Sequence, residues 1–191
     1  MPTLAPSEPR TTHRHLAVDL AVAIAIGFVA ALAKRYLDFR LGIPGHAGVG
    51  WIAALTFGWL INRRPGMSAL AGVSMAVSGV PLGLGHSLAY NVVLYGAAGG
   101  TLDVLAFVRV PIWRIWGAAA AGAGVHVVKF AVIFAIAWMS GIVKNVEVFG
   151  FTAALRNHVI FGAAGGLLGW AVWRGGRDLI DRRTVRRDSA P

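Results

Sequence analysis

Long apolar runs separated by short polar breaks dominate the chain. A helix needs about 20 apolar residues to cross the hydrocarbon core of a bilayer, and by that measure the chain contains six candidate spans. They cover residues 16–36, 48–62, 67–84, 88–108, 115–139 and 154–173. Pro65 with Gly66, and Pro111, stand in the breaks and stop the helices before them. The pattern predicts an all-α polytopic membrane protein with six transmembrane helices, the second of them short.

Two of the candidate spans contain nearly the same phrase. NVVLYGAAGG begins at Asn91, and NHVIFGAAGG begins at Asn157. Glycine weakens a helix in water by about 1 kcal/mol, whereas small residues four apart in a membrane helix let a neighbouring backbone approach closely. This spacing joins Gly96 to Gly100, Gly162 to Gly166, and Gly165 to Gly169. We therefore expect these glycine faces to pack helices together.

The composition agrees with a membrane protein. The chain is 57% hydrophobic and only 14% charged, against about 25% charged residues in soluble domains. It has no cysteine, which excludes disulfides, thiolate metal sites and a cysteine nucleophile. No Walker-type phosphate loop, HExxH or GxSxG motif is present. We therefore predict that the chain is not an enzyme and does not itself hydrolyse ATP.

The basic residues indicate an orientation rather than nucleic-acid binding, despite a net charge of +10. With the N-terminus inside, twelve fall inside: Arg10, Arg14, Arg63, Arg64, Arg109, Arg114, Arg174, Arg177, Arg182, Arg183, Arg186 and Arg187. Five fall outside: Lys34, Arg35, Arg40, Lys144 and Arg156. This excess of inner basic residues predicts that both termini are cytoplasmic. We expect a disordered N-terminus over 1–15, a transmembrane domain over 16–173 and a basic solvated tail over 174–191.

One basic residue falls in the middle of a predicted span. Lys129 lies about ten residues, or roughly 15 Å, from either end of the fifth span. At that depth its side chain does not easily reach the membrane surface. A charged residue at this depth costs about 2.5–3.5 kcal/mol on insertion scales and usually lines a site. His126 is three residues earlier, on the same helix face. The pair indicates either a ligand site or a purely structural hydrogen-bonded pair.

Further polar and aromatic residues fall at or near the outer side in this orientation. We predict that they surround a pocket open to the outside, with His126 and Lys129 below them. The candidate substrate-binding residues are His46, Trp51, His86, Asn91, His126, Lys129, Asn157 and His158. The desolvated amine of Lys129 would favour an anionic group, such as a carboxylate or a phosphate, on a small solute. No metal or cofactor is predicted for this pocket.

The chain resembles a known family of transport proteins. The stretch LGIPGHAGVGWIAALTFGWLINRRPGMSALAGV at 41–73 resembles the substrate-binding S components of energy-coupling factor (ECF) vitamin transporters. This resemblance implies uptake of a vitamin or similar solute across a bacterial inner membrane, together with a transmembrane coupling subunit and ATPase subunits. It also implies that the small residues of the first helix, Ala23, Gly27 and Ala31, dock on the coupling subunit.

Two other interpretations remain open at this stage. In the first, two or more of His46, His86, His126 and His158 hold haem or a metal ion, because histidine is a common axial ligand of iron. In the second, the chain is an integral membrane enzyme or a scaffold subunit whose glycine faces bind other chains. A Soret band in the absorbance spectrum would favour the first, and the identity of co-purifying proteins would separate transport from a scaffold.

Overall fold

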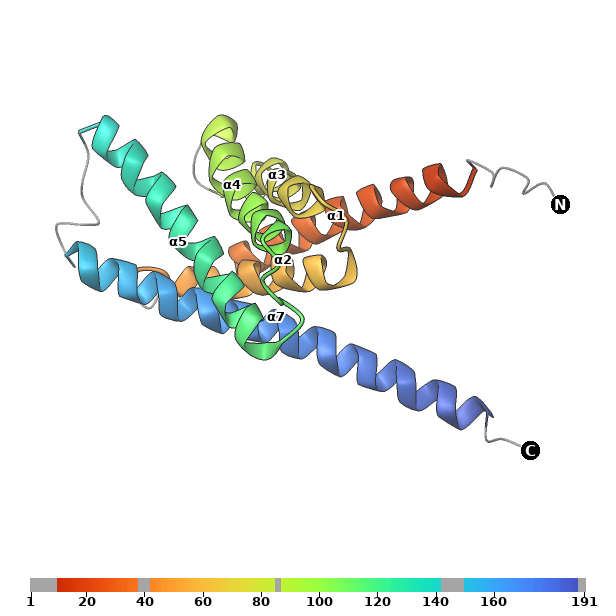
Figure 1. The fold of residues 1–191 in the computed structure, drawn as a ribbon. Helices are drawn as coiled ribbons and strands as arrows, with labels where there is room; N and C mark the ends of the chain where they lie inside the picture. Colours follow the sequence, from red (N-terminus) through yellow and green to blue (C-terminus); the bar gives the residue numbers. More distant parts are fainter. Residues whose placement is uncertain (1–9, 38–41, 85–86, 142–149, 189–191) are drawn as a thin grey trace, which may run out of the picture.

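The computed structural model describes residues 10–37, 42–84, 87–141 and 150–188. Within these ranges the regular structure is entirely helical, without a strand, and comprises six α-helices and a 3-10 turn, η1 (Figure 1). The elements are α1 (Arg10–Tyr36), η1 (His46–Gly48), α2 (Val49–Ile61), α3 (Met67–Gly79), α4 (Leu88–Phe107), α5 (Ile115–Met139) and α7 (Phe151–Asp188). The prediction of an all-α fold is confirmed.

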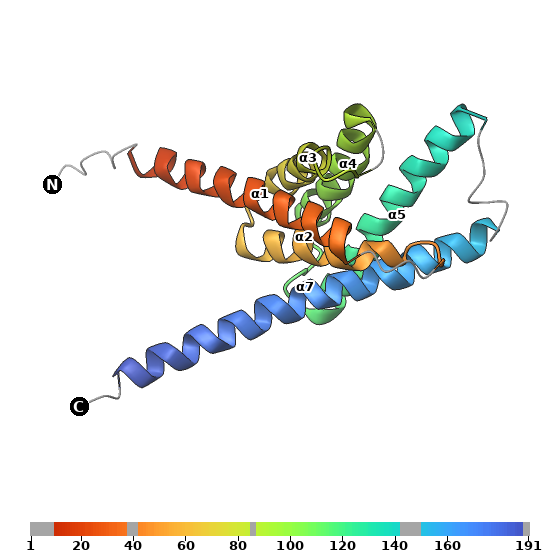
Figure 2. The ribbon, with the colours of Figure 1, turned by 180° about the vertical axis from the view of Figure 1, so that it is seen from behind.

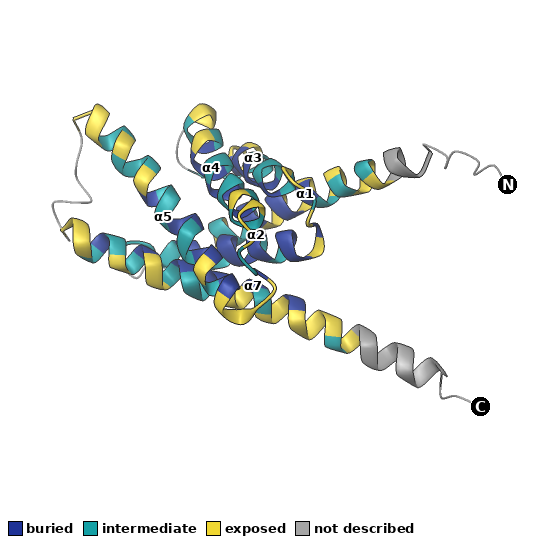
Figure 3. Cartoon of the chain, in the orientation of Figure 1, coloured by how far each residue is buried: buried dark blue, intermediate teal, exposed yellow. Residues whose placement is uncertain are grey.

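The helices form a closed ring in which each packs on the next. Going round it, α1 contacts α3, α3 contacts α4, α4 contacts α5, α5 contacts α7, α7 contacts α2, and α2 returns to α1. The beginning of α1 and the end of α7 lie at the same end of the molecule (Figures 1 and 2). Buried residues gather where the helices cross, and exposed ones cover their free ends (Figure 3). α2 is the most enclosed helix, with eight of its 13 residues buried.

Helix lengths divide the bundle into two groups. Among the described residues, three helical stretches are long and apolar enough to cross a bilayer, namely His15–Tyr36, Leu88–Phe107 and Ile115–Met139. α2 and α3 have 13 residues each, or about 20 Å of helix, which is less than the roughly 30 Å of a hydrocarbon core. The short second span predicted from the sequence is therefore matched by an equally short third helix.

The helix bounds differ from the prediction at three points. α1 begins at Arg10 instead of residue 16, and α7 continues to Asp188 where a solvated tail was expected. A salt bridge of 3.5 Å between Arg174 and Asp178, four residues apart, supports that extension. α3 ends early, at Gly79, because Pro81 has no N–H to continue the helix, and Gly83 then adopts a left-handed φ of 68°. This lets the Leu84 amide donate to the Gly79 carbonyl at 2.9 Å, which is a common helix-ending arrangement.

The second glycine phrase packs helices as predicted. Gly162 and Gly166 of α7 lie directly against the backbone of α5, where an added methyl group would overlap the Gly122 and Ala118 carbonyls. On the adjacent face, Gly165 and Gly169 lie against α2. Each predicted pair therefore lets the backbone of a neighbouring helix come into contact with the backbone of α7, which packs between α5 and α2.

The first glycine phrase packs through a different residue. The prediction of a face formed by Gly96 and Gly100 is wrong: Gly100 faces open space, and Gly96 approaches only the Val73 side chain. Gly99 instead lies against the Ser68 carbonyl of α3. Gly99 is four residues after Tyr95, and the two share the buried face of α4. The inward face of α4 is therefore the one that carries Tyr95 and Gly99.

The small-residue face of α1 is covered within the chain. Ala23 and Ala31 are buried, and Gly27 lies so close to α3 that an added methyl group would overlap the Ala71 carbonyl. In this conformation these three residues pack α1 on its own bundle, and their docking on a coupling subunit stays a prediction. The outward face of α1 carries large apolar side chains instead, among them Ile24 and Phe28, exposed by 53% and 49%.

Two glycine substitutions separate backbone contact from helix propensity. Gly122→Ala adds a methyl group against the Gly162 carbonyl, whereas Gly100→Ala adds the same group in open space. We expect Gly122→Ala to lower the free energy of unfolding by about 1–3 kcal/mol through overpacking. Gly100→Ala should leave the free energy of unfolding unchanged or slightly higher. Denaturant titration in detergent measures both, and equal effects would contradict the packing described for α5 and α7.

Candidate functional site

The deepest polar residues of the bundle meet where the first turn of α2 faces the middle of α5. His126 and Lys129 are the twelfth and fifteenth of the 25 residues of α5. The His126 imidazole is fully buried and stands edge-on to the Trp51 indole, with ring centroids 6.0 Å apart. Lys129 Nζ lies 5.3 Å from the centroid of the Trp51 ring. Lys129 is half-buried, and a cation over an indole face gains about 0.5–1 kcal/mol at exposed sites and about 2 kcal/mol when desolvated, which helps to hold the amine here.

A second histidine, from α7, completes the group. The rings of His126 and His158 lie 4.5 Å apart, centroid to centroid. His126 Nδ1 donates to the His158 carbonyl at 3.1 Å, and His158 Nδ1 donates to the Ala154 carbonyl at 2.8 Å. A carbonyl oxygen only accepts, so each Nδ1 carries a proton. Each ring, when neutral, therefore offers Nε2 as an acceptor. We call Trp51, His126, Lys129 and His158 the polar cluster.

Two polar atoms of the polar cluster are buried without a hydrogen-bond partner in the part of the chain that the structure describes. They are the Trp51 indole Nε1 and His126 Nε2. Nε1 can only donate, and Nε2 accepts in the tautomer fixed by the His158 carbonyl. Leaving such a group unpaired costs about 1–3 kcal/mol. With the Lys129 amine, the cluster can offer two donors and one acceptor to a small polar group.

The segment before α2 closes over the two histidines. Gly48 packs so tightly on the His126 imidazole that a methyl group at this position would overlap the ring. Gly45, with a left-handed φ of 89°, lies against the backbone of Asn157 and His158. Glycine adopts that φ without strain. The described residues 42–48 thus form a cover that meets α7 and α5 at the polar cluster.

Aromatic side chains that the sequence pattern did not indicate as site residues surround the polar cluster on its other sides. Tyr95 of α4 stands edge-on to Trp51 at 5.5 Å, and Phe130 of α5 lies 4.7 Å from the His158 ring. Phe151 then contacts Phe130 at 5.4 Å. Only the spacing of Tyr95 from Asn91, one helical turn, could have indicated its position. Aromatic residues are otherwise ordinary in apolar helices.

The remaining predicted residues take other places. His46 is half-buried in η1, where Nδ1 donates to the Ile43 carbonyl and the ring approaches Phe161 at 6.4 Å. Asn91 is buried, and its side-chain amide donates to the Leu84 carbonyl at 3.0 Å, which ties the start of α4 to the end of the α3 turn. Asn157 is half-buried beside His158. His86 lies outside the described residues.

The described residues do not gather a metal site. No three side chains of His, Cys, Asp or Glu in that part of the chain lie close enough together to hold a metal ion. His126 and His158 provide two imidazoles, whereas protein metal sites use at least three ligands from the chain in most structural and catalytic zinc centres. Haem needs only one or two axial histidines, so this observation bears on a metal ion alone.

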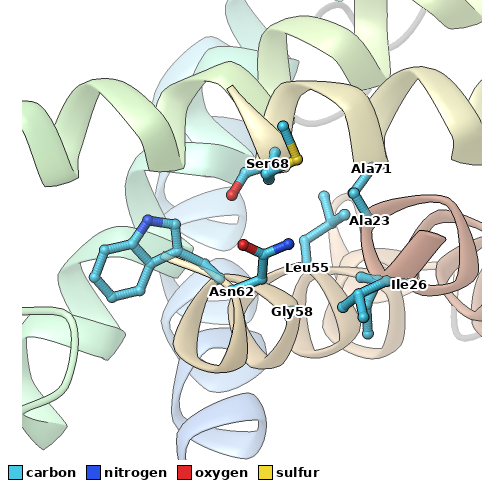
Figure 4. A pocket seen from close by; sticks show the side chains of 10 residues that line it. Ala23, Ile26, Leu55, Gly58, Asn62, Ser68 and Ala71 are labelled. Carbon is cyan, nitrogen blue, oxygen red and sulfur yellow. The ribbon is translucent and has the colours of Figure 1, made fainter. Parts of the chain in front are cut away.

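A small pocket lies at the opposite end of the bundle, between α1, α2 and α3. The Asn62 amide and the Ser68 hydroxyl point into it, and Ala23, Ile26 and Leu55 line its walls (Figure 4). Its volume of about 10 Å³ leaves room for roughly one water molecule. Ser68 Oγ is buried without a partner among the described residues. A water molecule in the pocket would give it a hydrogen bond. The pocket is too small for a solute.

Comparison with known proteins provides no relative for this chain. No protein family matches it, and no curated protein or solved structure is significantly similar to it. What the polar cluster does must therefore follow from its own residues.

Trp51 should be much more important for stability than an exposed tryptophan of the same bundle. Trp51→Ala removes contacts with Tyr95, His126 and Lys129 at a fully buried position, and we expect it to lower the free energy of unfolding by about 3–5 kcal/mol. Trp138 is 69% exposed, so Trp138→Ala should cost about 1 kcal/mol or less. Chemical unfolding followed by circular dichroism makes the comparison, and similar losses would contradict the central role of Trp51.

Proposed function

We propose that the chain is embedded in a membrane, with its helices crossing the bilayer. Large apolar side chains are exposed on several helices, including Phe28, Phe107, Trp138 and Met139, the last three by 86%, 69% and 77%. On α1 alone, Val18, Leu20, Ile24, Phe28 and Val29 are all exposed, and large apolar patches are rare on soluble monomers. Close glycine contacts between helices are the packing mode expected in lipid. Three helices long and apolar enough to cross support the same conclusion.

The proposed orientation places the start of α1 and the end of α7 in the cytoplasm. The described arginines near the start of α1, the end of α2, the start of α5 and the outer part of α7 include Arg63, Arg64, Arg114, Arg174 and Arg177. Positively charged residues accumulate on the cytoplasmic side of membrane proteins. The polar cluster then lies closer to the outer surface, below residues 42–48.

Cysteine labelling tests this orientation, because the chain has no cysteine of its own. Ser140 follows α5 at the proposed outer end, and Gly175 lies on the exposed inner part of α7. In intact cells, a membrane-impermeant thiol reagent should label Ser140→Cys directly and Gly175→Cys only after permeabilisation. The reverse pattern would invert the orientation, and labelling of both in intact cells would rule out the crossing.

Within the membrane, we propose that the polar cluster binds a small anionic solute taken up from outside. The carrying observation is the Lys129 amine, set over the Trp51 ring beside two unpaired polar atoms, Trp51 Nε1 and His126 Nε2. A carboxylate or phosphate would accept from the amine and the indole N–H. A donor group on the same solute would then satisfy the histidine.

Access to the polar cluster requires residues 42–48 to move. Gly48 occupies the space beside the His126 ring, and Gly45 rests on α7, so the cluster is closed in this conformation. Left-handed glycines at positions 42 and 45 provide backbone freedom on this segment. Lifting the segment would open a route from the outer side, and its return would exclude water from the bound charge.

The proposed mode of action is that of an ECF-type S component, with release of the solute driven by a separate coupling subunit and its ATPases in a bacterial inner membrane. Because Ala23, Gly27 and Ala31 are packed inside the bundle, a coupling subunit that engages α1 would meet its outward face, which carries Ile24 and Phe28. The resemblance over 41–73 and the closed polar cluster support this proposal.

Mass spectrometry of small molecules that co-purify with the protein tests solute binding. We expect an anionic molecule to accompany the detergent-extracted wild type, and Lys129→Met to reduce its amount at least tenfold. Arg35→Met removes a cation from the exposed end of α1 and should leave the amount unchanged. Circular dichroism and the thermal midpoint establish folding. Equal amounts in the wild type and a folded Lys129→Met variant, or none in either, would contradict the proposal.

A further inference from the structure

Arginine and tryptophan side chains from three segments contact one another at the end of the bundle opposite the polar cluster. This set combines the end of α2, the segment before α5 and the middle of α7. We call it the arginine–tryptophan patch and define it by Trp59, Arg63, Trp113, Trp170, Trp173 and Arg177. The solute binding proposed above does not use any of these residues.

Arg63 is held between two indole rings. Its guanidinium carbon lies 5.6 Å from the centroid of the Trp59 ring and 5.7 Å from that of Trp113. Trp59 is buried in the bundle, whereas Trp113 is 45% exposed. The fixed indole of Trp59 therefore sets the position of the cation, and the exposed Trp113 places it at the surface.

A hydrogen bond joins this group to α7. Trp170 Nε1 donates to the Trp113 carbonyl at 2.9 Å. Trp173 is three residues further along α7 and so on an adjoining part of the same helix face. The guanidinium carbon of Arg177 lies 5.1 Å from the Trp173 ring centroid. Two aromatic-supported cations thus belong to one surface.

Neither cation is neutralised by a carboxylate in the part of the chain that the structure describes. The ion pairs found there join Arg64 to Asp19 at 3.3 Å and Arg174 to Asp178 at 3.5 Å, so the neighbouring arginines are paired while Arg63 and Arg177 are not. A guanidinium near an aromatic ring can still direct its N–H groups toward other acceptors. These N–H groups match the oxygens of a phosphate, which they can bind in pairs.

We propose that the arginine–tryptophan patch binds the phosphate headgroup of an anionic phospholipid in the membrane leaflet at this end. The proposal rests on the membrane embedding argued above, but not on solute binding. A lipid is favoured over free phosphate because Ile115 and Trp116, exposed by 52% and 56%, adjoin Trp113 and offer apolar surface to the glycerol and acyl chains. Tryptophan at headgroup depth is typical of membrane interfaces, and cations there attract anionic lipids.

Lipid titration of the full chain in a neutral detergent tests the proposal. Phosphatidylglycerol should raise the thermal midpoint of the wild type more than phosphatidylcholine with the same acyl chains, and inorganic phosphate should not reproduce the shift. The double variant Arg63→Gln/Arg177→Gln should lose at least half of the difference between the two lipids. Arg35→Gln is the matched control, because Arg35 stacks on Tyr36 at 5.9 Å at the opposite end of α1, and it should keep the full difference.

Native mass spectrometry of the same samples counts retained lipids on folded protein alone, so a destabilised variant remains readable. More phosphatidylglycerol on the wild type and the Arg35→Gln control than on the double variant would support the patch. Equal effects of the two lipids, an equal shift with inorganic phosphate, or full retention by the double variant would each overturn it. Failure of membrane embedding is distinguished by the cysteine labelling, which does not involve these arginines.

Discussion

Backbone contact between α7 and its two neighbours is the constraint on which the rest of the bundle depends. Gly162 and Gly166 let α5 approach closely, and Gly165 and Gly169 do the same for α2. α7 therefore closes the ring of six helices through two faces that carry only glycine at the contact. Such closeness makes many weak dispersion contacts possible at once. It also has a geometric result. Only when α5 and α2 both approach α7 this closely do the first turn of α2 and the middle of α5 meet, and that meeting brings Trp51 to His126.

The polar cluster is held by this geometry although its residues are expensive to bury. Hydrogen bonds to backbone carbonyls offset part of the desolvation cost of His126 and His158. The contact with the Trp51 ring offsets part of that cost for Lys129. Trp51 Nε1 and His126 Nε2 recover nothing within the described residues. The solute proposed above would remove this deficit by pairing with both atoms.

The sequence predicted the elements well and their contacts less well. Hydrophobic run lengths and prolines located all six described helices, because the period and the breaks are local properties of the chain. Depth was also readable, since Lys129 and His126 stand in the middle of one helix. Which face turns inward was not: Gly99 rather than Gly100 packs in α4, and the Ala23–Gly27–Ala31 face is occupied by α3. These outcomes depend on neighbours far away in sequence, Ser68 for Gly99 and Ala71 for Gly27, and no local pattern encodes them.

α7 carries residues of both sites on one uninterrupted helix. It contains no proline, and 38 residues give about 57 Å of rod, with His158 near one end and Trp170, Trp173 and Arg177 further along. A straight helix that tilts at one end also moves at the other. If the tilt of α7 in the bilayer differs between the filled and the empty polar cluster, the contact of Trp170, Trp173 and Arg177 with lipid headgroups must differ too. Thermodynamic reciprocity then lets the surrounding lipid adjust the affinity for the solute by the same factor.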